Sequence, residues 1–222
     1  MKYVIVNDIY SFFNKYKLYV LMFLLTILSS VVVQKLIGVP VDQDLFLSSL
    51  GFRTNLDYGL IPFLLFILNC GIHIFVVAQI FNNDVKNGLE NIFLRMNLNK
   101  WINVKCFSIF LLNTILTLLL YISLMIIFAI NNVILNTTLK YVFINIIFFS
   151  FIEYLFLLIY LIAKRFKWTI PVFVVGFLLC TRFILVDITV MMENVIIFIL
   201  ITLFILVLIK IITRKNFIQI FE

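Results

Sequence analysis

Long uninterrupted apolar runs restrict the fold of this 222-residue chain more than any other feature of its sequence. An α-helix rises 1.5 Å per residue, so about 20 apolar residues cross the hydrocarbon core of a bilayer. We predict six such helices, at residues 18–38, 59–81, 106–130, 140–163, 169–190 and 195–212. The predicted fold class is therefore an all-α integral membrane protein, with residues 1–222 forming a single transmembrane domain.

The composition excludes the soluble classes of protein. Hydrophobic residues make up 65% of the chain and charged residues 12%, and a soluble domain of this length could not bury so much apolar surface. The net charge of +7 comes from Lys and Arg beside the apolar runs, so we predict no nucleic-acid partner. Cys70, Cys106 and Cys180 lack the spacing of metal ligands, so we expect small buried side chains and no metal site. We also expect no removable signal peptide, because no small-residue cleavage site follows a short apolar core.

The distribution of positive charge predicts the orientation. Six crossings place both termini on one side, and 13 of the 17 Lys and Arg residues fall on that side. The other four, Lys35, Arg53, Lys140 and Arg182, fall on the opposite side or within the spans. Because cytoplasmic loops carry an excess of Lys and Arg, we predict a multi-pass protein of the cell membrane with both termini in the cytoplasm.

Two segments outside the spans have the pattern of amphipathic helices. Residues 2–17 place apolar side chains on one helical face and polar ones, including Asp8, on the other, which predicts an interfacial helix. Residues 82–97 concentrate charge between the second and third spans, with an apolar stripe at Val85, Leu89, Ile92, Phe93 and Met96. This second segment is either a solvated helix that rests on lipid or a helix that binds a partner.

The arrangement resembles the permease subunit of the ABC-2 type of ATP-binding-cassette exporters. The shared features are an interfacial N-terminal helix, six spans, a long loop after the first span and a charged amphipathic helix between the second and third. That family's cytoplasmic pattern is similar to Asp84, Gly88, Glu90, Leu94 and the pair Asn99-Lys100. The chain departs from the family at Asn97, where Pro is usual, and at Lys105, which comes about two residues early.

The resemblance implies that residues 82–97 form a cytoplasmic coupling helix that enters a cleft on a separate ATPase subunit. The coupling residues that it implies are Asp84, Gly88, Leu89, Glu90, Phe93, Leu94 and Arg95. It also implies a second permease chain, identical or related, and a substrate path along the interface of the two chains. The sequence has no G-x-x-x-x-G-K-[ST] motif, so we expect a chain that is not itself an enzyme and holds no cofactor, with ATP and Mg on the partner ATPase.

Ionisable residues within the spans are further candidates for function, because they are costly in lipid. His73 and Glu153 lie at matched depths in the second and fourth spans, so we expect that they can meet. The pair would be a structural hydrogen bond between helices, a proton relay or part of a hydrolytic site, and the structural bond has the greatest weight. Arg182 and Asp187, near the outer end of the fifth span, would reach water, pair across helices or line a substrate path.

The resemblance therefore implies the permease subunit of an exporter, driven by a partner ATPase, that moves a hydrophobic or peptide-like substrate outward. Its small size suggests peptide export or immunity to a membrane-active bacteriocin. One alternative is an ion- or proton-coupled secondary transporter that uses His73 and Glu153. The other is a membrane immunity or scaffold protein that binds without transport.

Overall fold

The fold is that of a computed structural model, which describes residues 2–36, 38, 68–80, 97–131, 139–163 and 195–220. Across these ranges the chain is helical and contains no strand. The helices are α1 (Lys2–Leu36), a short helix (Leu68–Ile80), α5 (Leu98–Ile130), α6 (Leu139–Ala163) and α9 (Val195–Ile220). The four labelled helices are long and apolar enough to cross a membrane, so the prediction of an all-α membrane protein is confirmed at that level.

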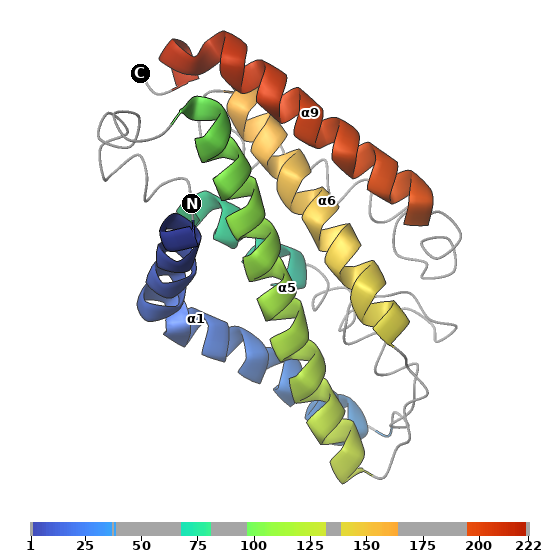
Figure 1. The fold of residues 1–222 in the computed structure, drawn as a ribbon. Helices are drawn as coiled ribbons and strands as arrows, with labels where there is room; N and C mark the ends of the chain where they lie inside the picture. Colours follow the sequence, from blue (N-terminus) through green and yellow to red (C-terminus); the bar gives the residue numbers. More distant parts are fainter. Residues whose placement is uncertain are drawn as a thin grey trace.

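The N-terminal helix is longer than either of the two segments predicted for it. A single helix, α1, covers residues 2–36 because no Gly or Pro interrupts its backbone hydrogen bonds. Figure 1 shows α1 changing direction between its dark blue N-terminal part and its lighter blue remainder. Beyond its end, Gly38 has a φ of 88° and donates its N–H to the Lys35 carbonyl oxygen at 3.1 Å. Glycine adopts this left-handed conformation without steric cost, which explains why the helix stops here.

The other helices also differ in extent from the predicted spans. α5 begins at Leu98, before residue 106, because Asn97 caps it by accepting a hydrogen bond from the Asn99 N–H at 3.2 Å. α9 extends to Ile220, beyond residue 212. Of the predicted second span, residues 68–80 are described, whereas the predicted fifth span and residues 82–96 lie outside the described ranges.

Contacts near the helix ends fix the directions of three helices. α1 and α5 run in the same direction, because Asp8 meets Lys105 near their starts and Lys35 meets Asn131 near their ends. α6 runs opposite to α5, because Asn113 of α5 bonds α6 at Ile146, whereas the Cys106 carbonyl bonds it at Tyr154. Figure 1 shows α9 beside α6 and running the same way.

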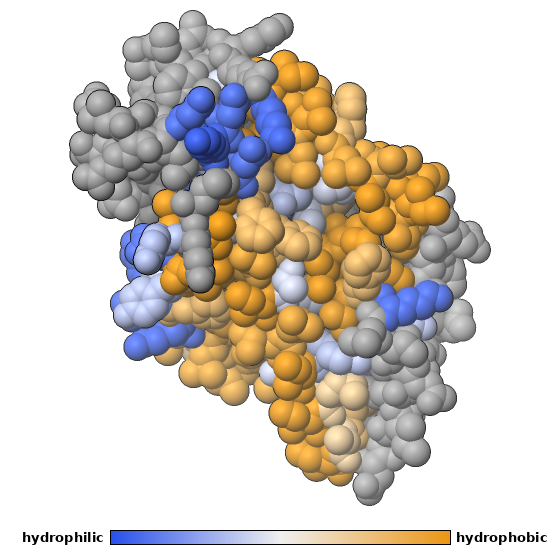
Figure 2. Space-filling view, viewed as in Figure 1, coloured by the Kyte–Doolittle hydropathy of each residue, from blue (hydrophilic) through white to orange (hydrophobic). Residues whose placement is uncertain are grey.

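The core lies between α1, the short helix, α5 and α6, and the outward faces of the helices expose apolar side chains. Large buried side chains include Trp101, Phe128, Phe149 and Phe156. By contrast, α9 exposes Ile196, Leu200, Phe204, Val207 and Ile211. Figure 2 shows apolar side chains over most of the described surface on the face in view. A surface of this kind is stable in lipid and not in water, so the described helices form a membrane-embedded bundle.

Candidate functional site

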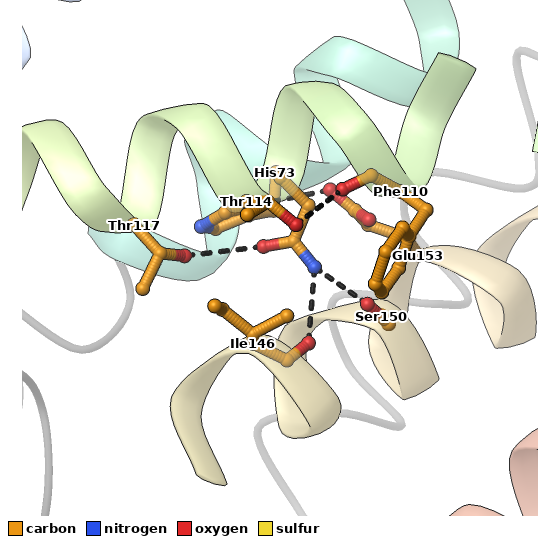
Figure 3. Close-up of polar contacts among 8 residues, drawn as sticks. His73, Phe110, Thr114, Thr117, Ile146, Ser150 and Glu153 are labelled. Atoms are coloured by element: carbon orange, nitrogen blue, oxygen red, sulfur yellow. Dashed lines mark hydrogen bonds and ion pairs between the residues drawn. The ribbon is translucent and has the colours of Figure 1, made fainter. Parts of the chain in front are cut away.

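Among the described residues, three clusters of polar side chains lie at helix contacts inside the bundle. They are the His73–Glu153 pair, the Asp8–Lys105–Ser108 cluster and a network around Asn113. Figure 3 shows the first and third of these clusters in one view, with Ser150 and Glu153 on the same helix. Because a polar group buried in lipid must find a partner within the protein, these clusters are the candidates for both structure and function.

His73 of the short helix and Glu153 of α6 are brought together, 80 residues apart in the sequence. The His73 Nδ1 and Glu153 Oε1 atoms lie 3.0 Å apart, and the two residues are 1% and 0% exposed. The imidazole is stacked on the Phe149 ring, which lies one turn before Glu153, with ring centroids 4.1 Å apart. The stack and the hydrogen bond together fix the orientation of the imidazole against α6.

The His73–Glu153 pair can be buried without net charge. An acid and a base that share one proton are neutral together, whether the proton is on Oε1 or on Nδ1. The second oxygen of Glu153, Oε2, has no hydrogen-bond partner among the residues that the structure describes. The pair is therefore able to hold a proton, and one acceptor atom remains for a further donor.

Asp8, Lys105 and Ser108 form a second cluster, which the sequence analysis did not identify. Lys105 Nζ donates to both Asp8 carboxylate oxygens, at 2.8 and 2.9 Å, and Ser108 Oγ donates to Asp8 Oδ2 at 2.9 Å. The Lys105 side chain is 2% exposed and that of Asp8 is 11% exposed. The cluster ties the N-terminal part of α1 to the first turns of α5. The available signal was that Asp8 is the only acidic residue before Asp42.

The third cluster joins the middle of α5 to α6. Asn113 Nδ2 donates to Ser150 Oγ at 2.7 Å and to the Ile146 carbonyl oxygen at 3.1 Å, while Thr117 Oγ1 donates to Asn113 Oδ1 at 3.2 Å. These bonds occupy both ends of the Asn113 amide, which is 0% exposed. The sequence signal was the single amide side chain in the predicted span at 106–130. A fully bonded network of this kind stabilises a helix contact and has no atom left for chemistry.

Aromatic side chains hold the short helix against α1. Phe75 packs edge-on against Tyr16, with ring centroids 5.0 Å apart, and also contacts Phe12 and Tyr19. Tyr16 donates a hydrogen bond to Gln79 Oε1. Since the same short helix carries His73, this packing also positions the His73–Glu153 pair.

Most of the site residues implied by the family resemblance cannot be placed. Asp84, Gly88, Leu89, Glu90, Phe93, Leu94 and Arg95 lie outside the described residues, as do Arg182 and Asp187. Their roles in coupling and in a substrate path stay predictions. The described segment that adjoins the predicted coupling helix is the start of α5, with its cap at Asn97 and the buried Lys105.

The chemistry available in the described part of the bundle is proton transfer and ion pairing. In these ranges no three His, Cys, Asp or Glu side chains gather as metal ligands would. Cys70 and Cys106 are buried free thiols, and the Cys106 carbonyl accepts the Tyr154 hydroxyl at 3.0 Å. No family model, no curated protein and no solved structure matches the chain.

Proposed function

We propose that the chain is the permease subunit of an exporter, in which six membrane helices move a hydrophobic or peptide-like substrate outward. A separate cytoplasmic ATPase supplies the energy through residues 82–97, and a second permease chain completes the substrate path. The proposal rests on the sequence pattern of residues 82–97 and on one structural observation, which is the way that α5 begins.

That observation is the buried ion pair that joins the start of α5 to α1. The helix begins at Leu98, directly after the predicted coupling helix, and continues unbroken to Ile130. Within its first turns, Lys105 forms a buried ion pair with Asp8 of α1. A displacement of residues 82–97 would therefore be passed to α1 and α5 together, because the ion pair joins the two helices. A partner-driven permease needs a mechanical link of this kind.

The helix directions support six crossings. α1 and α5 run the same way, and so do α6 and α9. Two spans with the same direction can be joined only if the chain returns across the membrane between them. The predicted spans at 59–81 and 169–190 supply those two returns, and the short helix Leu68–Ile80 lies within the first.

The predicted topology can be tested by labelling single cysteines from outside the cell. We expect a membrane-impermeant thiol reagent to label cysteine introduced at Gln43 or Asn132 and not at Asn87. Cys70 and Cys106 are buried, and labelling of the parent protein, which also contains Cys180, provides the background. Labelling of Asn87→Cys from outside would overturn the orientation and place the proposed coupling helix on the wrong side.

The coupling role can be tested by substitutions in residues 82–97. Shifting the populations of two conformations of the bundle from 1:99 to 99:1 takes about 5.5 kcal/mol. An exposed ion pair supplies at most about 1 kcal/mol. Apolar side chains of residues 82–97 that dock on the ATPase must therefore provide most of this free energy. We expect Leu89→Ser with Phe93→Ser to reduce substrate-stimulated ATP hydrolysis more than Glu90→Ala with Arg95→Ala does. The measurement is ATP turnover by the ATPase that co-purifies, reconstituted with each variant.

Both double variants should insert normally, because no predicted span is changed. The matched control is Lys164→Ala with Lys167→Ala, in the basic turn between the fourth and fifth predicted spans, which should affect orientation more than coupling. If substrate still stimulates ATP hydrolysis fully in the Leu89/Phe93 variant, residues 82–97 only rest on lipid and do not couple the ATPase to the permease. Transport that follows a proton gradient without ATP would favour a secondary transporter, and binding without transport would favour an immunity protein.

A further inference from the structure

The Glu153 carboxyl is buried among the described helices in surroundings that do not suit an ionised carboxylate. Oε1 contacts His73 Nδ1, and Oε2 has no partner among the described residues. Asp8 provides the contrast within the same molecule, because its carboxylate accepts three hydrogen bonds, two of them from an ammonium group. A carboxylate needs such donors when it is buried, whereas a carboxylic acid needs one acceptor for its proton. His73 supplies that acceptor.

We propose that His73 and Glu153 form a proton-binding site inside the bundle, in which Glu153 is a carboxylic acid that shares its proton with the His73 imidazole. In the shared bond, the O–H bond at Oε1 breaks as the N–H bond at Nδ1 forms, and the electron pair stays on the carboxylate. The net charge of the pair is zero before and after the transfer. This inference does not depend on the proposed role as an ATPase-driven permease.

The burial of both residues favours a proton as the ligand. His73 and Glu153 are 1% and 0% exposed, and the Phe149 ring covers the imidazole. A metal ion would need several ligands and an amine would need a cavity, whereas a proton needs a single acceptor atom. Oε2 then gives an entering water molecule a point of attachment when α6 and the short helix separate, and through that water the site exchanges its proton.

Among the residues that the structure describes, the other ionisable groups near the pair do not compete for its proton. Cys70, Cys106 and Tyr154 are buried, and thiols and phenols are weaker acids than a carboxylic acid. Tyr154 already donates its hydroxyl to the Cys106 carbonyl. On α1 and α5, Asp8 and Lys105 are paired with each other, and Lys210 of α9 is exposed. The proton of the site is therefore assigned to the pair itself.

Infrared spectroscopy of the purified full-length protein in lipid vesicles tests the proposal directly. Exposed carboxyl groups are ionised at pH 7, so a carboxylic-acid C=O band at that pH reports a buried protonated acid. We expect the band in the parent protein, its loss in Glu153→Gln and no change in Asp8→Asn. If Glu153→Gln does not fold, Glu153→Asp keeps the acid and should shift the band instead.

Exchange of the proton is read from the same band in D2O. We expect the whole band to move to lower frequency, because water reaches Oε2 when the helices separate. Absence of the band at pH 7 would mean that the pair is ionised and would overturn the proposal. A band that stays at its original frequency after prolonged incubation in D2O would identify a sealed structural acid, and it would also overturn the proposal.

Discussion

Replacing Asp8 with Ala is expected to destabilise the protein by about 3–5 kcal/mol, because it removes the carboxylate that is paired with the buried Lys105 ammonium. Lys105 Nζ has both Asp8 oxygens within 2.9 Å, and its side chain is 2% exposed. Ser108 loses its acceptor at the same time. The measurement is the free energy of unfolding of the purified protein in bicelles, compared with that of the parent.

The design needs two controls. Asp8→Leu with Lys105→Met removes both charges and keeps apolar volume, so it should be close to the parent in stability. Lys15→Ala removes an exposed lysine whose ammonium lies over the Tyr16 ring, 5.3 Å from its centroid, and should change stability by about 0.5 kcal/mol or less. If Asp8→Ala is no more harmful than Lys15→Ala, the Lys105 side chain reaches water without Asp8 and the α1–α5 link fails.

Replacing His73 with Leu should cost less, about 1–3 kcal/mol, because it leaves a neutral carboxylic acid without its acceptor. Glu153→Leu should have a similar effect, since it leaves a neutral imidazole without its donor. The double variant should recover much of the loss, because an apolar pair has no unsatisfied polar atom. A double-mutant cycle on unfolding free energies measures the coupling.

A buried charge without a partner is more costly than a buried neutral group. Asp8→Ala should therefore lower the free energy of unfolding more than His73→Leu does. Tyr154→Phe is the matched control on α6, because it removes one neutral hydrogen bond to the Cys106 carbonyl and should cost about 0.5–1.5 kcal/mol. If His73→Leu costs as much as Asp8→Ala, the Glu153 carboxyl is ionised, contrary to the proton-binding site.

The helices themselves could be predicted because their causes are local. Length and apolarity alone identify α5, α6 and α9 as membrane helices, since about 20 apolar residues suffice to cross a bilayer. Helix ends are also local in origin. The predicted first span ends at Gly38, close to the observed end of α1 at Leu36, whereas Asn97 shows why the start of α5 was missed. The apolar pattern marks where lipid begins, whereas α5 starts eight residues before the predicted span, at a capping side chain that can lie outside the lipid.

The depth of a polar residue also follows from the sequence, because each helical residue advances the chain by 1.5 Å. Counting residues put His73 and Glu153 at one level, and the structure places them 3.0 Å apart. Such a count does not show which helices pack against each other. That choice depends on which helix faces pack, and it therefore depends on the whole bundle at once.

Asp8 shows what only the tertiary structure decided. In sequence it belongs to the polar face of an amphipathic segment, where water or headgroups would satisfy it. In the fold, α1 lies along α5, and Asp8 becomes the counter-charge of Lys105, 97 residues away. Asn113 and Ser150 meet in the same way. The sequence by itself determined apolar helices and the depth of their polar groups, but the partners of those groups were decided by packing, because a hydrogen bond forms only where two helices bring donor and acceptor within about 3 Å.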